Sequence, residues 1–489
     1  MGKFGDRFFQ TRGILFLLLI YISIGAVVTL GVWDQVAAKE PAAGNKGAHL
    51  QSVSVDSDTD GLVVQLGLEG PLSYRVWSTP SPSKVIIDLH NTVVGTGVQG
   101  FALDDVLAKR VRITQYPNYS RVVVDLAHSV PTPIHEVQGN TLMVYINRNY
   151  RQGYETLVAP GVRYGQFRQG GEAGQVLVNY LRVSPRSRAS IRPVLAKGGA
   201  GGLETVDSMA KAHDAIAAVN GNFFAGNGKP LGFLMIDGEI AGYPIYNRSA
   251  FGITATGQVL IDQVDAVGYF QWADREPITI SGVNRVRRTD DLILYTPEYG
   301  KTTGTNHFGL EVVVEQGVVI ACSEEGNSLI PPQGFVLSAH GNSRELLSDI
   351  AVGDPVTAHW ELRPDWIEMG VVHAVGAGPR LVKDGKIAIN GVEERFQSDV
   401  LYGRAPRTGF GVTETGEIVL VTVNGRRGAV SVGMTLRELA ELMITLGAVD
   451  AINLDGGGSA TLVVRDRVLN LPSDGRERPV GSAILVLAD

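Results

Sequence analysis

The sequence predicts an α+β fold in which strands dominate. It predicts a strand-rich C-terminal domain with a few helices, preceded by a small all-β sandwich and an N-terminal transmembrane helix. Three observations support this class. Short apolar runs with period two or β-branched residues recur after residue 50, two segments carry a helical period, and one uncharged apolar stretch lies near the N-terminus.

Composition limits the classes of protein that the chain can belong to. The 489 residues are 44% hydrophobic and 19% charged, so most of the chain should fold into more than one core. The net charge of −7 lacks the basic footprint of a nucleic-acid-binding protein, and we expect no nucleic-acid partner. Cys322 is the single cysteine, which excludes an intrachain disulfide and a cysteine-rich metal site.

The N-terminus predicts the compartment. Residues 13–33 are uncharged and long enough to cross a membrane as a helix, and three basic residues precede them. The positive-inside rule then leaves residues 1–12 in the cytoplasm and the bulk of the chain outside, as a single-pass protein of the cell membrane. Small residues at 36–38 leave signal cleavage and secretion open as the alternative. The polar, Ala/Gly-rich residues 34–50 predict a linker.

Residues 51–150 predict an all-β domain. Two runs, KVIIDLH at 84–90 and RVVVDLA at 121–127, are near copies, which indicates two similar β-halves that face each other in a sandwich. Asp88 and Asp125 occupy the same place in the two runs, and we expect a structural role for both. This segment resembles the AMIN domain, and the resemblance implies binding at the cell wall.

Residues 157–489 mix strands, hairpins and two helices. A helix is predicted at 205–218, and another at 436–446, where Thr435 and Glu438 form a capping box and Gly447 stops the helix. Hairpin turns are predicted at four pairs of residues, Asp237-Gly238, Thr256-Gly257, Asp384-Gly385 and Thr415-Gly416.

The most informative stretch is AVDAINLDGGGSATLVV at 448–464. Asp455 follows a buried strand, and three glycines separate it from the next strand. Consecutive glycines let the backbone approach a ligand closely or present N–H groups to an anion, so a phosphate could bind there. A tight turn capped by the aspartate is the alternative.

Three further polar motifs lie at comparable places. NGNFF at 220–224 follows the first predicted helix and a short strand, GAGPRLVKDG spans 376–385, and RTGFG spans 407–411. Together with the glycine run they offer amides, a carboxylate and a guanidinium group.

With these motifs, the chain from about residue 161 to its end resembles the phosphodiester glycosidase family. The resemblance also rests on LGFLMIDGE at 231–239 and on the tail at 469–486. It implies a catalytic domain at 157–489 that hydrolyses glycosyl phosphodiesters, with residues 282–360 forming a lid or a substrate wall. Asn222 departs from the family pattern, which usually has glycine there.

The resemblance allows roles to be assigned residue by residue. Asp455 is expected to act as nucleophile or base, Arg407 to bind the departing phosphate, and Asn220 to hydrogen-bond the sugar or orient water. Residues expected to bind substrate complete the set: Gly456, Gly457, Gly458, Ser459, Asn222, Asn424, Arg426 and Arg478.

The resulting hypothesis is an envelope-anchored hydrolase that acts on sugar-1-phosphodiesters in cell-wall or capsular polysaccharide. The alternative is a non-catalytic protein that binds cell-wall glycan. The nine histidines show no HxH or HxxxH spacing, which disfavours a metal-dependent phosphodiesterase. A divalent cation bound by carboxylates stays open, and the metal ligands are unknown.

Overall fold

The computed structural model describes residues 47–197 and 201–488, and strands make up most of it, as the sequence predicts. The α-helices in these ranges are α1 (Val206–Ala212), α2 (Ser398–Tyr402) and α3 (Leu436–Thr445). Short 3-10 helices are η1 (Pro297–Tyr299), η2 (Gly341–Leu346) and η3 (Gly457–Ser459). Within the described ranges, no helix is long and apolar enough to span a membrane, and the anchor predicted at 13–33 lies outside them.

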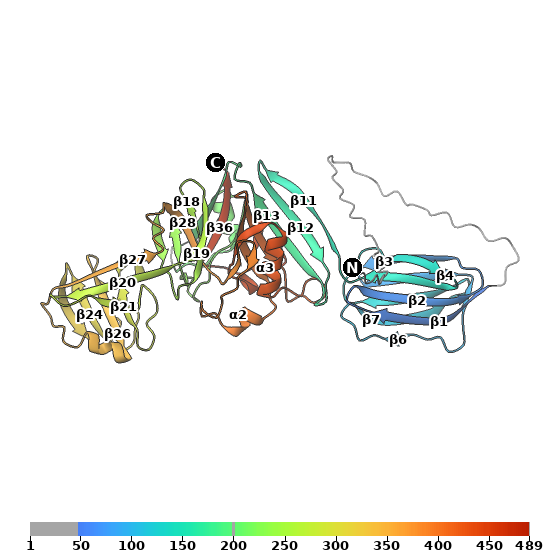
Figure 1. Cartoon of the computed structure of the whole chain (residues 1–489), viewed down its shortest axis with the longest axis horizontal. Helices are drawn as coiled ribbons and strands as arrows, with labels where there is room; N and C mark the ends of the chain where they lie inside the picture. The colour runs from blue at the N-terminus through green and yellow to red at the C-terminus, as the bar shows by residue number, and fades with distance from the viewer. Residues whose placement is uncertain (1–46, 198–200, 489) are drawn as a thin grey trace, which may run out of the picture. The chain divides into compact units, whose positions relative to one another are not determined.

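The N-terminal part of the described chain is a β-sandwich, which confirms the predicted all-β module (Figure 1). One sheet has the order β5 (Thr92–Val94), β1 (Ala48–Ser57), β2 (Gly61–Glu69), β10 (Thr141–Asn147) and β9 (Ile134–Gln138). The other has the order β3 (Tyr74–Pro80), β4 (Ser83–His90), β8 (Tyr119–Leu126), β7 (Ala108–Gln115) and β6 (Phe101–Ala102). Alternate apolar side chains of both sheets form one buried core.

The prediction that the two near-copy runs face each other was wrong. They form β4 and β8, which pair antiparallel in the same sheet, with Val85 opposite Val124. The two runs have similar sequences because both form inner strands of this sheet, and in both every second residue faces the core. Asp88 lies opposite Arg121 and forms an ion pair with it at 2.6 Å, and Asp125 pairs with two arginines of β7. The two aspartates therefore have the structural role that the sequence predicts.

An eight-stranded sheet, which we call the wide sheet, forms the centre of the C-terminal domain. Its order is β11 (Arg151–Ala159), β12 (Val162–Gln169), β13 (Val176–Val183), β32 (Ile418–Val423), β31 (Arg407–Thr413), β33 (Ala448–Asn453), β29 (Arg380–Lys383) and β30 (Lys386–Ile387). Strands that are distant in sequence are therefore neighbours.

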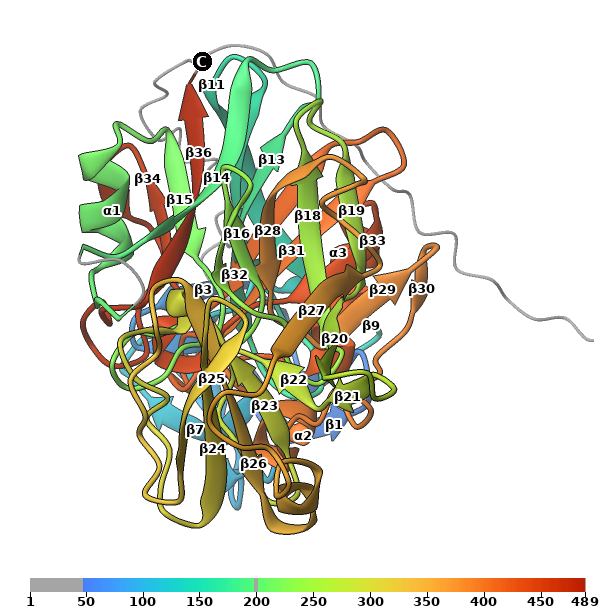
Figure 2. The same ribbon diagram turned by 90° about the vertical axis from the view of Figure 1, so that its left-hand side faces the viewer.

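A five-stranded sheet, the short sheet, has the order β14 (Ala189–Leu195), β36 (Ser482–Ala488), β15 (Ala217–Asn220), β34 (Leu462–Val464) and β35 (Arg467–Val468). In Figure 2, β36 runs between β14 and β15. Buried residues of the wide and short sheets, including Leu420, Ile452, Val219 and Ile484, share one hydrophobic core. The two sheets are thus layers around a common interior.

Helix α3 packs on the opposite face of the wide sheet. The structure confirms its predicted start, its capping box and a stop at Gly447, whose φ of 93° requires glycine. Glycines at 409 and 411 on β31 allow this close approach, because a Cβ at Gly411 would lie 2.6 Å from Cε of Met443. On the core-facing side of the same strand, Phe410 stacks on Phe251 with ring centres 3.7 Å apart.

The first predicted helix is shorter than expected. Helix α1 ends at Ala212, and Asp214 takes a left-handed φ of 50° before the chain enters β15. Ile216 and Ala217 fit a helical face by their spacing from residues 209, 210 and 213, but both lie beyond the helix, and Ala217 begins the buried strand β15. All four predicted hairpin turns connect paired strands.

Three smaller sheets complete the C-terminal domain. The first has the order β17 (Glu239–Gly242), β16 (Leu234–Ile236), β28 (Val371–Gly376), β18 (Ser249–Thr254) and β19 (Val259–Gln263). The second has the order β21 (Ile278–Ile280), β20 (Asp265–Trp272) and β27 (Val356–Arg363). The third has the order β22 (Gly282–Val283), β23 (Leu292–Tyr295), β26 (Gly334–His340), β24 (Gly309–Glu315) and β25 (Val318–Ser323). The expected lid or wall at 282–360 therefore contains the third of these sheets and the first part of β27.

Candidate active site

The predicted polar motifs meet where the wide and short sheets end. The loop at 454–461 leaves β33 of the wide sheet and enters β34 of the short sheet. In the wide sheet, Leu454 N donates to Thr408 O at the start of β31, and Gly378 N donates to Asn453 O. In the short sheet, Gly221 N donates to the carbonyl of Ser482. The antiparallel order therefore gathers motifs from five distant segments at one rim.

Asn220 fastens the two sheets together at this rim. Its side-chain amide donates to the main-chain oxygen of Asp455 at 2.7 Å, and its oxygen accepts from the Thr408 hydroxyl at 2.8 Å and from Thr461 N at 3.1 Å. The residue is 1% exposed. All of this hydrogen bonding is internal, so Asn220 is a positioning residue that holds Asp455 in place.

We expect Asn220→Ala to lower the free energy of unfolding by about 2–4 kcal/mol, because three buried partners lose their hydrogen bonds at once. Thermal unfolding followed by circular dichroism measures this. The exposed Asn342 offers a matched control, since Asn342→Ala should change the stability by less than about 0.5 kcal/mol. Equal melting temperatures for the two variants would contradict the positioning role of Asn220.

The glycine run forms a floor between two arginine side chains. Gly457 has a φ of 60°, and a Cβ there would lie 3.5 Å from both terminal nitrogens of Arg426. A Cβ at Gly458 would overlap the guanidinium group of Arg478. At 458, glycine therefore lets Arg478 approach the turn, whereas at 457 a Cβ would only touch Arg426 and the left-handed φ is what favours glycine.

Fewer backbone N–H groups of the glycine run are available to an anion than the sequence predicts. Gly457 N donates to Pro406 O at 2.9 Å, and Gly456 N donates to the carboxylate of Asp455. The groups here that are best suited to an anion are the two guanidinium groups, Arg426, which is exposed, and Arg478, which is half-buried and paired with Asp474 at 2.7 Å.

Asp455 is the carboxylate at the centre of this arrangement. Burial raises the pKa of its side chain to about 6, although hydrogen bonds from Ser459 and Gly456 and the positive charge of Arg478 oppose the shift. Ser459 itself is 1% exposed and belongs to η3. A carboxyl group that titrates near neutral pH at a cationic site is suited to act as base or nucleophile.

The same shift predicts how stability depends on pH. The pKa of Asp455 is about 6 in the folded chain and near 3.8 in the unfolded chain, so the folded state binds more protons between these values and loses stability as pH rises through them. Asp455→Asn removes this loss. Its melting temperature should exceed that of the wild type by about 2–6 °C at pH 8 and should match it near pH 4. A constant difference across this range would show that the carboxyl is not shifted.

Two parts of the chain match the models of known families. Residues 308–487 match the family model for phosphodiester glycosidase, and residues 52–146 match the model for the AMIN domain. The chain carries a phosphodiester glycosidase domain and an AMIN domain. The matched range contains Arg407, Arg426, Asp455 and Arg478, whereas the NGNFF motif lies before it.

Individual relatives resemble parts of the chain. It is 36% identical over 103 residues to the N-acetylglucosamine-1-phosphodiester alpha-N-acetylglucosaminidase of Bos taurus, a match that covers 19% of this chain and 19% of the bovine protein. An uncharacterised protein of Rickettsia conorii is 28% identical over 227 residues, which cover 44% of this chain and 77% of that protein. A crystal structure of a hypothetical protein from Synechocystis shares the fold, with a TM-score of 0.62 and 24% identity over 91% of this chain and 81% of that one.

Arg407 of the phosphodiester glycosidase domain lies behind the site and is 4% exposed. Its guanidinium group donates to the main-chain oxygens of Met434, Val400 and Gly403, at 2.9, 3.1 and 2.5 Å. Burial and the nearby charge of Arg426 lower the pKa of Arg407 to about 10. The side chain thus ties α2 and the start of α3 to β31, and its expected contact with phosphate stays a prediction.

Asn222 and Asn424 are buried at the edges of the rim. Asn222 accepts a hydrogen bond from the Ser482 hydroxyl, and Asn424 accepts one from Leu471 N at 3.2 Å. The side-chain nitrogens of both asparagines have no hydrogen-bond partner in the described structure. Both nitrogens are themselves buried, and the contact with sugar hydroxyl groups that the sequence suggests stays a prediction.

One buried acid of the domain has no signal in the sequence. Glu394 is 0% exposed and accepts hydrogen bonds from the amide and hydroxyl of Ser249, at 2.9 and 2.6 Å, and from Arg380 N at 3.2 Å. Burial raises the pKa of Glu394. It sits in a polar segment without periodicity, so only the fold shows that it supports the GAGPR motif.

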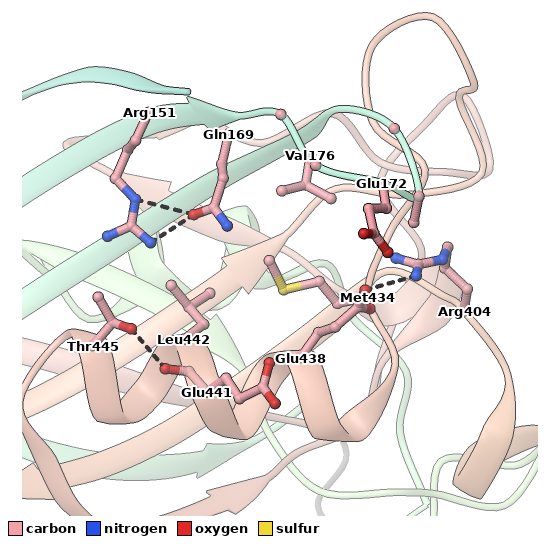
Figure 3. Close-up of a pocket in the computed structure, with 14 residues that line it drawn as sticks. Arg151, Gln169, Glu172, Val176, Arg404, Met434, Glu438, Glu441, Leu442 and Thr445 are labelled. Carbon is pink, nitrogen blue, oxygen red and sulfur yellow. Dashed lines mark hydrogen bonds and ion pairs between the residues drawn. The ribbon is translucent and has the colours of Figure 1, made fainter. Parts of the chain in front are cut away.

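A pocket of about 550 Å³ beside α3 contains none of the predicted site residues (Figure 3). Arg404 lies at one end and pairs with Glu438 at 2.7 Å, so its charge stabilises the α3 capping box. Across the residues that the structure describes, no group of three or more His, Cys, Asp or Glu side chains could hold a metal ion. The structure thus adds no ligand set for the divalent cation left open by the sequence.

Proposed function

We propose that the chain is a hydrolase that cleaves the glycosidic bond of sugar-1-phosphodiesters in cell-wall or capsular polymers. The sugar proposed is N-acetylglucosamine or a close analogue, by analogy with the name of the bovine relative. The observation that carries the proposal is Asp455, a carboxyl with a pKa of about 6 at a glycine turn flanked by Arg426 and Arg478.

In the proposed reaction, the bond between the anomeric carbon and the phosphate oxygen breaks. Asp455 attacks the anomeric carbon and forms a glycosyl ester that water then hydrolyses, or it takes a proton from a water molecule that attacks there. The electron pair of the broken bond leaves with the phosphate, whose growing charge Arg426 and Arg478 stabilise. Water supplies a hydroxyl to the sugar and a proton to the solution, and the products are free sugar and a phosphomonoester.

This chemistry explains why one carboxylate can suffice. A phosphate is a good leaving group, so it needs cations more than a strong general acid. Asp474 also lies at the site, but its carboxylate forms an ion pair with Arg478 and positions that guanidinium group. A single carboxylate between two cations matches the demands of a phosphodiester.

The AMIN domain offers a surface suited to the polymer partner. Arg121 lies 5.5, 5.7 and 5.3 Å from the ring centres of Trp77, Tyr116 and Tyr119, and the two tyrosines stack at 4.5 Å. Aromatic rings with a polar or charged neighbour are typical of surfaces that bind sugars in water. In the proposed function, this domain holds the enzyme on cell-wall polysaccharide.

The proposal places the chain in the cell membrane, anchored through residues 13–33 with the catalytic domain outside. Protease added to intact spheroplasts should therefore digest residues 50–489, whereas a cytoplasmic loading control survives. Protection of these residues would contradict the proposed topology.

The direct test is hydrolysis of a panel of sugar-1-phosphodiesters by the purified chain without its anchor. We expect N-acetylglucosamine and a phosphomonoester as the two products. Release of sugar 1-phosphate would instead indicate attack at phosphorus. Binding to cell-wall glycan without hydrolysis of any member of the panel would favour the non-catalytic alternative.

A further inference from the structure

Four guanidinium groups surround one tyrosine ring next to the site. The guanidinium carbons of Arg288, Arg395, Arg248 and Arg285 lie 4.6, 5.2, 5.6 and 5.6 Å from the centre of the Tyr246 ring. They come from three loops, between β17 and β18, after β22 and before α2. We call these five side chains the arginine cluster.

Two phenylalanines link the arginine cluster to the candidate site. Phe396, the neighbour of Arg395, packs against Phe223 with ring centres 5.6 Å apart, and Arg248 lies 4.0 Å above the Phe396 ring. Phe223 belongs to the NGNFF motif, whose Asn220 holds Asp455. Packed side chains therefore connect the cluster to the segment whose Asn220 holds Asp455.

The positive charge of the cluster is only partly neutralised. Arg285 forms two hydrogen bonds with Asp291, at 2.6 and 3.0 Å, and Arg248 donates to the main-chain oxygen of Glu394 at 3.0 Å. Arg288 and Arg395 are exposed, and neither forms an ion pair with any residue that the structure describes. Two guanidinium forks are therefore free to bind an anion.

Two further carboxylates lie near the cluster, and both are disfavoured in their charged form. Burial raises the pKa of Asp265, which faces Arg285 and Arg395, and burial raises the pKa of Glu394, which faces Arg248. Four like charges around one ring repel one another. Burial lowers the pKa of Arg248, and the positive charge of Arg288 lowers it further. An anion bound between them would relieve this repulsion.

We propose that the arginine cluster binds a second phosphate of the substrate, so that the substrate is a polyanionic chain with repeated phosphodiester groups. This inference rests on the proposed function, because it takes the bond cut at Asp455 to belong to the same polymer. The whole chain carries a net charge of −7, so the attraction is local to the cluster rather than a property of the whole surface.

The test compares two double variants of the full chain in detergent, Arg288→Gln/Arg395→Gln and the matched control Arg186→Gln/Arg188→Gln. Arg186 and Arg188 are also exposed and lie in the turn between β13 and β14. The probe is poly(glycerol phosphate), and calorimetry at low and high salt measures its Kd. We expect the first variant to bind about tenfold more weakly, with a shallower salt dependence, and the control to bind like the wild type.

Three results would overturn the inference: equal Kd values for the wild type and the cluster variant, no binding by the wild type, or tighter binding of duplex DNA with the same number of phosphates. The proposed function is tested separately, by hydrolysis of a small sugar-1-phosphodiester by the wild type. Cluster-dependent binding of the polymer without that hydrolysis would refute the function and leave an anion site. Hydrolysis without cluster-dependent binding would refute the inference alone.

Discussion

Asp455→Asn should lower kcat by a factor on the order of 10³ or more on any sugar-1-phosphodiester that the wild type hydrolyses. The substitution is almost isosteric and removes the negative charge that a nucleophile or base needs. The main-chain oxygen that accepts from Asn220 is kept, so the loop should hold its conformation. Steady-state kinetics at pH 7 to 8, where the wild-type carboxyl is ionised, measures the loss.

A matched control separates chemistry from a general effect of charge. Asp466 is exposed in the turn between β34 and β35, and its left-handed φ of 60° also suits asparagine. Asp466→Asn should retain the wild-type kcat within about twofold. The Asp455→Asn protein should also be folded and slightly more stable at pH 8. Wild-type turnover in that protein would mean that another group performs the chemistry.

Arg426→Ala should lower kcat/KM by about 10²-fold, because one of the two cations facing the departing phosphate is lost. The side chain is exposed above Gly457, so the fold should be unaffected. Kinetics with a sugar-1-phosphodiester and thermal unfolding of the same preparation test both statements.

The neighbouring arginine provides the control for this prediction. Arg427 is also exposed, and its guanidinium group donates to the main-chain oxygen of Pro472 at 3.0 Å. Arg427→Ala should change kcat/KM by less than about threefold. Comparable losses of kcat/KM in the two variants would mean that Arg426 acts only through the overall positive charge of the loop.

The loop of the candidate site could be predicted from the sequence because its pattern is local. A capping box, a buried strand and the run from Asp455 to Ser459 follow one another. Each can be recognised from the local sequence alone. The AMIN sandwich was also predictable, since its strands are short apolar runs rich in β-branched residues. The facing arrangement of the near copies was not, because strand order depends on pairing between distant segments.

The roles of the arginines could not be read from the motifs. Arg407 begins a strand beside glycines, and only tertiary packing shows that three main-chain oxygens surround it. Arg426 and Arg478 lie in loops whose motifs resemble solvated turns, yet the fold brings both to the glycine floor. Glu394 and the arginine cluster arise from contacts across the chain, which leave no periodic signal.

Hydrolysis in water labelled with oxygen-18, with mass spectrometry of both products, tests the central claim most directly. Cleavage at the anomeric carbon places the label on the sugar and leaves the phosphomonoester unlabelled, and this is the result we predict. Label on the phosphate would show attack at phosphorus, and it would contradict the mechanism proposed for Asp455, Arg426 and Arg478.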